Sequence, residues 1–430
     1  PPKADIDNEN NNIHAILNGN LHEKVAKLYP VSSDQLFLVW VGVGLRLAYL
    51  RDYGQSALGF TLLMGALAMQ WAVLCRGVFQ TDMGQIFIGM ESILGAERSA
   101  LSAVISYGAF MGLASPLQAL VLTFLHVPLQ AALQHHTDNI LQTVDRGGSI
   151  SIHLFAAVFG VTASWGIMGD KNYSSKRLHT SKHSQILSMV GMVVMVIYMN
   201  SSSVTHEGSK VTLDGRPCPC DDRYRLAINT FLAVTTAVTV AFPVSSIVNT
   251  RRKFNFMDIQ TGVLGGSVAV AAVAELSIQP IGAMVIGAAT SIICILSKRI
   301  LRPRIRQYVG VHDTACIGVS HGLGGLLGAL VGVIMAATAP TPGTKESDYN
   351  MSYSYFKLYP ARSPTTTSYA YQELVKDLAI EPGLGRSALT QAQVQLLAIA
   401  VTVVTAAVAG AFIGKMLSYI QQCKPFLYDC

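Results

Sequence analysis

Charged residues are scarce in this chain. Asp, Glu, Lys and Arg make up 13% of its 430 residues, whereas a soluble domain carries about a quarter. Hydrophobic residues make up 51%, and apolar runs of about 20 residues, enough for a helix to cross a bilayer, recur along the sequence. A soluble globular protein is therefore excluded. The pattern predicts an all-α polytopic membrane protein, because the strands of a membrane barrel would be about ten residues long and alternating.

Several features of enzymes and soluble binding proteins are also missing. The sequence holds no combination of nucleophile and base, so no enzymatic activity is expected, and no motif predicts a cofactor. The glycine-rich stretch 322–332 looks like a nucleotide loop, but it lies within an apolar run, where small residues let helices approach closely. The formal net charge of +6 reflects basic residues in loops and predicts no nucleic-acid partner. The chain starts without Met or an apolar signal segment, so we expect that it begins inside a longer precursor or is a fragment.

The apolar runs predict about eleven transmembrane helices. We expect 1–34 to form an extracellular N-terminal segment, 35–418 the transmembrane domain and 419–430 a cytoplasmic tail. The predicted helices span 35–50, 54–75, 96–115, 116–136, 148–168, 184–202, 226–249, 258–277, 279–297, 313–340 and 390–418.

Basic residues indicate how these helices are oriented. An odd number of crossings places the two ends of the chain on opposite sides, and the basic loops all fall on one side, which the positive-inside rule makes cytoplasmic. Residue 1 is therefore expected outside and Cys430 inside, with Asn350 as a glycosylation acceptor in an outer loop. The basic residues are Arg46, Arg51, Lys171, Lys176, Arg177, Lys182, Arg251, Arg252, Lys253, Lys298, Arg299, Arg302, Arg304, Arg306, Lys415 and Lys424.

One pattern occurs twice: Asp, seven residues, His, six residues, Gly. The first copy is DRGGSISIHLFAAVFG and the second is DTACIGVSHGLGGLLG. Asp313 follows Asp145, and His321 follows His153, by the same 168 residues. Each copy opens an apolar run, so each places its histidine inside a predicted span. An ionisable side chain inside a span is costly and indicates a functional site, with the other copy as its natural partner.

The positions of the two copies predict an inverted repeat. They lie on the fifth and tenth predicted spans, so their helices cross the membrane in opposite directions. The expected halves are about 35–168 and 184–340, followed by an extra helix at 390–418, with the site near the midplane between the halves. Along ideal helices, the two histidines would lie about 8 Å and about 12 Å from opposite faces of a ~30 Å core, which leaves about 10 Å between them unless helix tilt closes the gap.

Two facing imidazoles predict a particular kind of site. A hydrogen bond between them fixes complementary tautomers, so the pair offers one acceptor and one donor nitrogen to a passing molecule. An apolar lining that includes Ile152, Phe155 and Val319 would reject ions because their desolvation is costly, and would pass a small neutral polar solute. Metal ligation is the weaker alternative, because two histidines without a third ligand form an incomplete site.

Each copy of the pattern starts with an aspartate. Asp145 and Asp313 precede the start of their helices, where a carboxylate caps free N–H groups and interacts favourably with the helix dipole. Asp145 has a second interpretation, in which it shapes an outer vestibule or attracts cations. We weigh capping above direct binding.

The matching stretches of this chain resemble the Rh glycoprotein branch of the ammonium transporter family. They are SALGFTLLMGALAMQWAVL, DRGGSISIHLFAAVFG, RLAINTF, IQTGVLGGSVAVAAVAE and SHGLGGLLGALVG, in the family's order over roughly 36–340. The resemblance implies an inverted five-plus-five helix bundle in the plasma membrane. It also implies a trimer with one pore per subunit, either homomeric or formed with Rh relatives. Rh members usually have one more helix before the first span seen here.

The resemblance also implies roles for individual residues. His153 and His321 match the family's paired pore histidines, Asp145 its vestibule aspartate and Asp313 its inner aspartate. The implied activity is passage of ammonia, which is delivered as ammonium and deprotonated near the pore. Some members are also proposed to pass carbon dioxide.

Two positions depart from the family pattern. Arg98 and Ser202 stand where the family usually places two gating phenylalanines, so a surface that attracts cations is lost, and an arginine near the mouth would repel ammonium. The stretch SALSAVIS also resembles the Rh blood-group polypeptides. The alternative function is therefore a non-conducting or weakly conducting structural subunit that assembles with a conducting Rh relative. An ion-coupled transporter of another solute is the least favoured class.

Overall fold

Helices make up most of the described structure. The computed structural model describes residues 28–52, 54–168, 179–203, 222–340, 356, 358–368, 371–372 and 381–420. In this part of the chain, eight helices are long and apolar enough to cross a membrane. They are Leu28–Leu47, Ser56–Gln80, Pro116–Ile140, Ser149–Ile167, Arg225–Val248, Pro280–Val309, Gly318–Thr338 and Ala388–Ser418.

The other three predicted spans are helical as well. α4 (Met90–Phe110) carries Glu97 and Arg98 within its sequence, while α7 (Lys182–Ser203) and α9 (Phe256–Ala271) contain shorter apolar stretches. The described residues thus contain a helix at each of the eleven predicted positions, and the all-α polytopic fold is confirmed.

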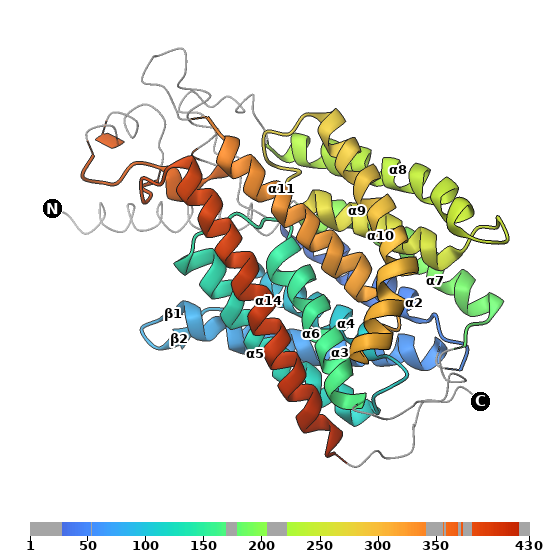
Figure 1. Ribbon diagram of the computed structural model, residues 1–430. Coiled ribbons are helices and arrows are strands. Elements are labelled where there is room, and N and C mark those ends of the chain that lie inside the picture. The colour runs from blue at the N-terminus through green and yellow to red at the C-terminus, as the bar shows by residue number, and fades with distance from the viewer. Residues whose placement is uncertain are drawn as a thin grey trace, which may run out of the picture.

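Figure 1 shows how these elements are arranged in space. Besides α4, α7 and α9, the elements in chain order are η1 (Leu38–Val43), α2 (Gly44–Leu47), α3 (Gly54–Gly77), η2 (Val78–Gln80), β1 (Thr81–Asp82), β2 (Gln85–Ile86), α5 (Pro116–His135), η3 (His136–Ile140), η4 (Ser149–Leu154), α6 (Phe155–Met168), α8 (Asp222–Val248), α10 (Pro280–Val309), η6 (Gly318–Leu323), α11 (Gly324–Thr338), η8 (Pro360–Arg362) and α14 (Ala388–Ser418). The two strands pair in a single antiparallel hairpin.

Some predicted features fall outside the described residues. These are the glycosylation acceptor Asn350, the basic residues Lys171, Lys176, Arg177 and Lys424, most of the N-terminal segment, and all but the first residues of the C-terminal tail.

Several helix boundaries differ from those expected from hydropathy. α10 continues to Val309, past the predicted end at 297, because the Lys and Arg residues that follow are good helix formers although they are not apolar. It ends at Gly310, whose positive φ of 75° suits a left-handed C-cap. The chain is already helical at Leu28, the first residue that the structure describes, before the predicted start at 35. α9 ends at Ala271, before the predicted 277.

Local sequence explains where α5 begins. The Ser115 hydroxyl accepts a hydrogen bond from the Gln118 N–H, and the Gln118 side chain accepts one from the Ser115 N–H. This reciprocal arrangement is a capping box. Pro116 occupies the first helical position, where its fixed φ is suitable and its missing N–H costs nothing. The sequence Ser-Pro-Leu-Gln therefore separates α4 from α5 sharply.

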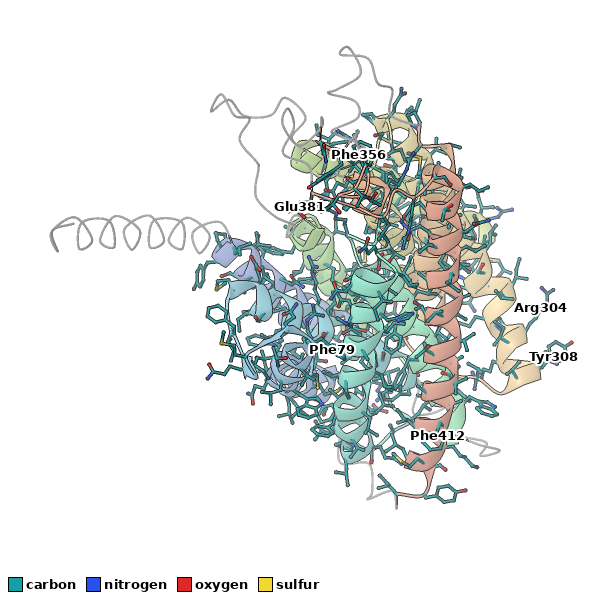
Figure 2. The ribbon with its side chains drawn as sticks, turned by 90° about the vertical axis from the view of Figure 1, so that its left-hand side faces the viewer. Phe79, Arg304, Tyr308, Phe356, Glu381 and Phe412 are labelled. Carbon is teal, nitrogen blue, oxygen red and sulfur yellow. The ribbon has the colours of Figure 1, made fainter. Side chains whose placement is uncertain are left out.

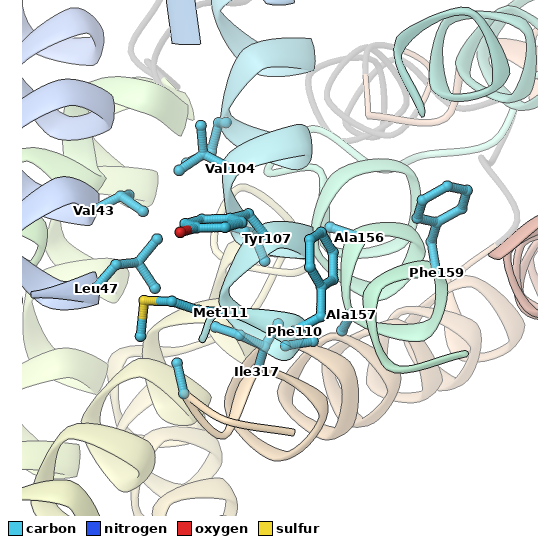
Figure 3. Close-up of a cluster of buried hydrophobic side chains, with 14 of the residues drawn as sticks. Val43, Leu47, Val104, Tyr107, Phe110, Met111, Ala156, Ala157, Phe159 and Ile317 are labelled. Atoms are coloured by element: carbon cyan, nitrogen blue, oxygen red, sulfur yellow. The ribbon is translucent and has the colours of Figure 1, made fainter. Parts of the chain in front are cut away.

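Helices that are distant in sequence pack side by side. α14 lies along α6 and also contacts α11, while α10 packs against α8 and α9 (Figure 1). In Figure 3, Tyr107 and Phe110 of α4 lie between Leu47 of α2 and Ala156 of α6. Both aromatic side chains are buried. Because lipid is as apolar as these side chains, such packing stabilises the bundle mainly through van der Waals contact.

Glycines let α11 approach α9 very closely. A Cβ added at Gly328 would lie 2.3 Å from the Ala269 carbonyl oxygen, and one at Gly324 would lie 2.8 Å from the Gly265 carbonyl oxygen. These distances leave no room for any side chain. The interpretation of the glycine-rich stretch as a helix-packing surface is thereby confirmed.

Large apolar side chains also cover the outside of the bundle. Phe412 of α14, which Figure 2 shows pointing away from the bundle, is 70% exposed. Such residues suit contact with lipid. By contrast, Arg304 and Tyr308 extend outward near the C-terminal end of α10 (Figure 2), where the helix has become basic.

Candidate functional site

The first copy of the repeated pattern forms a capped turn that leads into η4. The Asp145 carboxylate accepts hydrogen bonds from the N–H groups of Ile150 and Ser151, at 3.1 and 2.8 Å, and from the Ser151 hydroxyl at 2.8 Å. Gly148 has a positive φ of 68°, which allows the chain to turn into the helix. Asp145 thus acts as a capping residue in this structure.

The second copy is built in the same way. The Asp313 carboxylate accepts hydrogen bonds from the N–H groups of Ile317 and Gly318, at 2.7 and 2.9 Å. Cys316 has a positive φ of 57° and takes part in the turn that leads into η6. Both aspartates therefore cap the turn that leads into their helix, as their shared spacing predicts.

Both histidines lie in π-helical turns, His153 in η4 and His321 in η6. The His153 N–H donates to the Gly148 carbonyl over 2.9 Å, a step of five residues. Such wide turns are rare and are often found at functional sites. Sequence spacing did not predict them, because a π-turn of one or two hydrogen bonds leaves no periodicity to detect.

The histidine side chains meet directly. Their Nδ1 atoms lie 3.2 Å apart, and the ring centroids lie 5.1 Å apart with an interplanar angle of 21°. Both side chains are buried, with 6% of His153 and 2% of His321 exposed. The gap of about 10 Å in depth that ideal helices would leave is therefore closed in the structure. That gap assumed straight ideal helices starting at the membrane faces, whereas both histidines lie in π-helical turns that follow capped turns.

This contact determines which nitrogens remain available. A hydrogen bond between two Nδ1 atoms requires that one ring carries its proton on Nδ1 and the other on Nε2. The pair then presents one Nε2 lone pair and one Nε2–H to a third molecule. In the part of the chain that the structure describes, no cluster of three His, Cys, Asp or Glu side chains could hold a metal ion.

Arg98 lies on α4 and is partly buried. It interacts electrostatically with one cation, Arg76, and with three carboxylates, those of Glu97, Asp138 and Asp145. Its charge therefore lies among groups that compensate it. This arrangement reduces the repulsion of ammonium that the sequence alone suggests for an arginine at the mouth. Ser202 lies in the last turn of α7, and its side chain is outside the described residues.

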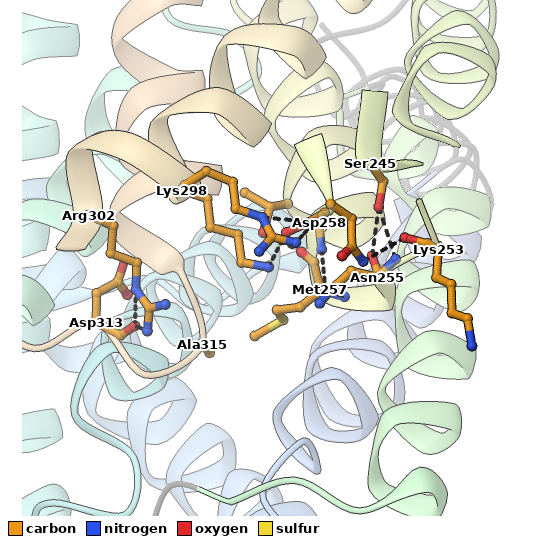
Figure 4. Close-up of polar contacts among 12 residues, drawn as sticks. Ser245, Lys253, Asn255, Met257, Asp258, Lys298, Arg302, Asp313 and Ala315 are labelled. Carbon is orange, nitrogen blue, oxygen red and sulfur yellow. Dashed lines mark hydrogen bonds and ion pairs between the residues drawn. The ribbon is translucent and has the colours of Figure 1, made fainter. Parts of the chain in front are cut away.

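Two arginines bind the backbone of the loop that precedes the second histidine. Arg302 donates two hydrogen bonds to the Asp313 carbonyl, at 3.0 and 2.5 Å, and Arg46 donates one to the Ala315 carbonyl at 3.0 Å. Figure 4 shows Arg302 beside Asp313. The sequence indicated only that these arginines face the cytoplasm. In the structure they fix the loop that carries the chain into η6.

One buried ion cluster was missed by sequence analysis. Asp258 of α9 is fully buried and accepts hydrogen bonds from Lys298, at 2.6 Å, and from Arg299, at 2.5 and 3.2 Å (Figure 4). Its only signal in the sequence is an acidic residue three positions after Asn255, which caps α9. That spacing suits a helix start but does not identify the partners on α10.

Comparison with known proteins identifies the family. The model of the Ammonium Transporter Family matches residues 18–424. The chain belongs to the ammonium transporter family. It is 31% identical over 356 residues to the ammonium transporter Rh type C of Oryctolagus cuniculus, which covers 82% of this chain and 74% of that one. It is also 31% identical over 326 residues to the ammonium transporter Rh type A of Bos taurus, covering 75% and 74%. Within the ammonium transporter family, the chain belongs to the Rh branch.

Solved structures of two other proteins share its fold. The Nitrosomonas europaea Rh50 protein, described as one of the Rhesus protein family of channels, superposes with a TM-score of 0.71 at 21% identity, covering 94% of this chain and 90% of that one. Saccharomyces cerevisiae Mep2 superposes with a TM-score of 0.62 at 16% identity, covering 90% and 83%.

Proposed function

We propose that this chain conducts ammonia across a membrane through a pore that passes the paired histidines. Membership of the ammonium transporter family supports ammonium as the transported species. The observation that carries the pore assignment is the 3.2 Å contact between the Nδ1 atoms of His153 and His321, buried between the two halves of the chain.

The chemistry of the histidine pair suits neutral ammonia. One Nε2 accepts a hydrogen bond and the other donates one, and ammonia both donates and accepts. Ile152 and Leu154, which flank His153 in the chain, are apolar and buried, so an ion would lose its hydration without replacement. Ammonium therefore transfers a proton to water before it enters the apolar section. The proton stays on the side of entry, and ammonia crosses alone.

Orientation and assembly complete the proposal. The basic end of α10, with Arg304 and Arg306, lies on the cytoplasmic side of the plasma membrane, and Asp145 lies toward the outer side. Subunits assemble as homotrimers or with Rh relatives. These assignments rest on charge distribution and on the family resemblance.

A second candidate is a subunit that conducts weakly or not at all. It is favoured by Arg98, which stands at a predicted gate position on α4. In this alternative, the histidine pair is a structural contact, and transport requires a conducting relative.

Flux through purified protein separates the two candidates. We would reconstitute the wild type, His153→Ala, His321→Ala and Arg98→Phe in proteoliposomes and follow ammonia-driven pH change and methylammonium uptake. His135→Ala is the matched control, because that side chain contacts Asn139 and Phe79 at the end of α5.

The expected result is flux in the wild type and in the control, with loss of about tenfold or more in either pore-histidine variant. Flux that appears only with Arg98→Phe would mean a pore closed at its mouth. No flux in any version, with each protein folded, would contradict the channel proposal and favour the subunit.

A further inference from the structure

A third histidine lies buried beside the candidate pore. His126 of α5 is fully buried, as are Ser102 and Ser106 of α4. Its Nε2 lies 3.0 Å from the Ser102 hydroxyl, and its Nδ1 lies 3.3 Å from the Ser106 hydroxyl. Both ring nitrogens therefore have partners, and both partners belong to one face of the neighbouring helix.

The same two serines reach the segment that carries His153. The Ser102 hydroxyl lies 3.4 Å from the Ile152 carbonyl oxygen, and the Ser106 hydroxyl lies 2.9 Å from the Ala156 carbonyl oxygen. One carbonyl directly precedes His153 and the other follows it by three residues. The serines thus contact the backbone on both sides of the pore histidine.

The His126 ring also touches this segment itself. Its centroid lies 5.1 Å from the Phe155 ring and 4.7 Å from the Phe159 ring, both in edge-on contact. These aromatics belong to α6, which continues from η4. His126 therefore contacts the His153 segment through two rings and through two bridging hydroxyls.

The number of available protons links the hydrogen bonds of His126 to those of Ser102 and Ser106. A serine hydroxyl donates one hydrogen bond, and a neutral imidazole has one N–H. If His126 carries its proton on Nδ1, it donates to Ser106, which is then free to donate to the Ala156 carbonyl, while Ser102 donates to Nε2. If the proton is on Nε2, the roles reverse, and Ser102 donates to the Ile152 carbonyl. The tautomer of His126 thus selects which serine hydroxyl is free to donate to a backbone carbonyl: Ser106, to Ala156 at 2.9 Å or to Ser102 in its own helix at 3.1 Å, or Ser102, to Ile152.

We propose that His126 is a positioning residue for the pore. Through Ser102 and Ser106 it holds the π-helical turn of η4 in the orientation that brings the His153 ring against the His321 ring. A π-turn is less stable than an α-helical turn, so it needs external partners to persist. This inference rests on the proposed pore function of His153 and His321.

Two substitutions distinguish positioning from simple filling of space. His126→Leu retains an apolar side chain in a pocket bordered by two phenylalanines, but it cannot bond either serine. His126→Gln retains one donor and one acceptor on a side chain of similar reach. If His126 only fills the core, Leu is tolerated at least as well as Gln. If it positions η4, Gln is tolerated and Leu is not.

The experiment measures flux and structure on the same proteins. Wild type, His126→Leu, His126→Gln and Ser106→Ala would be reconstituted for methylammonium uptake, with KM and maximal rate determined separately. The separation of the Nδ1 atoms of His153 and His321 would be determined by cryo-electron microscopy. Thr123→Val is the control, because that buried hydroxyl on α5 donates to the Ala119 carbonyl within its own helix.

We expect His126→Leu to lower the maximal rate by about tenfold, because a small misplacement of a reacting group has a large effect on rate. KM should change little, and the two Nδ1 atoms should move out of hydrogen-bond range. His126→Gln and the control should stay within about threefold of the wild-type rate. Ser106→Ala should lower the maximal rate by an intermediate amount. If the His126→Leu protein does not fold, Ser106→Ala takes its place in the comparison.

A wild-type rate and an unchanged Nδ1 separation in His126→Leu would overturn the inference. So would equal losses in the Leu and Gln variants. If the wild type carries no flux, the proposed function fails, and the Nδ1 separation in the His126→Leu protein alone then decides whether His126 positions His153.

Discussion

The hydrogen bonds of single side chains determine which polar atoms remain available at the candidate site. The Nδ1 atoms of His153 and His321 contact each other, so the two Nε2 atoms remain for a third molecule. Asp145 and Asp313 use their carboxylates on backbone N–H groups, so each holds the start of a histidine-bearing turn. A histidine and the aspartate that caps its turn are thus linked within each copy of the pattern.

Asp145 provides a test by pH. Burial raises the pKa of its carboxyl to about 6, and the neighbouring charge of Asp138 acts in the same direction, while the hydrogen bonds from Ser151 and Ile150 act against it. Asp145 lies between the spans that end at Ile140 and begin at Ser149. The carboxyl is therefore ionised above this pH, where it attracts cations, and neutral below it.

We expect the KM for external methylammonium to rise as the external pH falls through about 6. Uptake would be measured in proteoliposomes from about pH 5 to about pH 8, a range that includes the pKa of Asp145. Asp145→Asn should show the raised KM at every pH. An identical pH profile in the variant and the wild type would contradict this assignment.

Two kinds of contact join α9 to its neighbouring helices. α9 and α11 meet through glycines, so their backbones touch. α9 and α10 meet through the buried carboxylate of Asp258 and the two cations Lys298 and Arg299. A buried charge is tolerated because it is paired, and removing one partner leaves the others uncompensated.

Substitution of Asp258 should therefore destabilise the bundle. We expect Asp258→Asn to lower the free energy of unfolding by about 3 kcal/mol, since Lys298 would remain buried without its partner. The measurement is thermal unfolding of the purified protein in detergent. Asp52→Asn is the control, because the Arg51–Asp52 pair is exposed to solvent and contributes little. Equal melting temperatures for the two variants would show that the buried cluster does not stabilise the fold.

At the scale of the whole molecule, the remaining question is how the bundle sits in the membrane. Met83 lies in the hairpin between α3 and α4 and is 99% exposed, while Tyr308 near the end of α10 is 80% exposed. From the distribution of basic residues, we propose that the hairpin lies outside the cell and the end of α10 inside.

Cysteine labelling tests this orientation. In a background with Cys218, Cys220, Cys423 and Cys430 replaced by Ser, Met83→Cys should react with a membrane-impermeant maleimide on intact cells. Tyr308→Cys should react only after permeabilisation. The reverse labelling pattern would invert the proposed orientation, and reaction of both sites from outside would contradict the predicted number of crossings between them.

Much of this molecule could be predicted from its sequence. Hydropathy determined that the chain is an all-α polytopic membrane protein, because a helix that crosses lipid must be apolar over about 20 residues. The constant spacing of Asp145–His153 and Asp313–His321 identified the histidine pair and its capping residues. Such features are encoded by residue type and spacing alone.

Only the tertiary structure decided how these pieces meet. Four contacts join segments that are far apart in the chain. They are the Nδ1 contact of the two histidines, the carboxylates around Arg98, the partners of Asp258 and the serines around His126. Their distances depend on π-turns, on helix ends displaced from the hydropathy boundaries, and on close approach at glycines. None of these follows from local sequence, because each results from the packing of several helices at once.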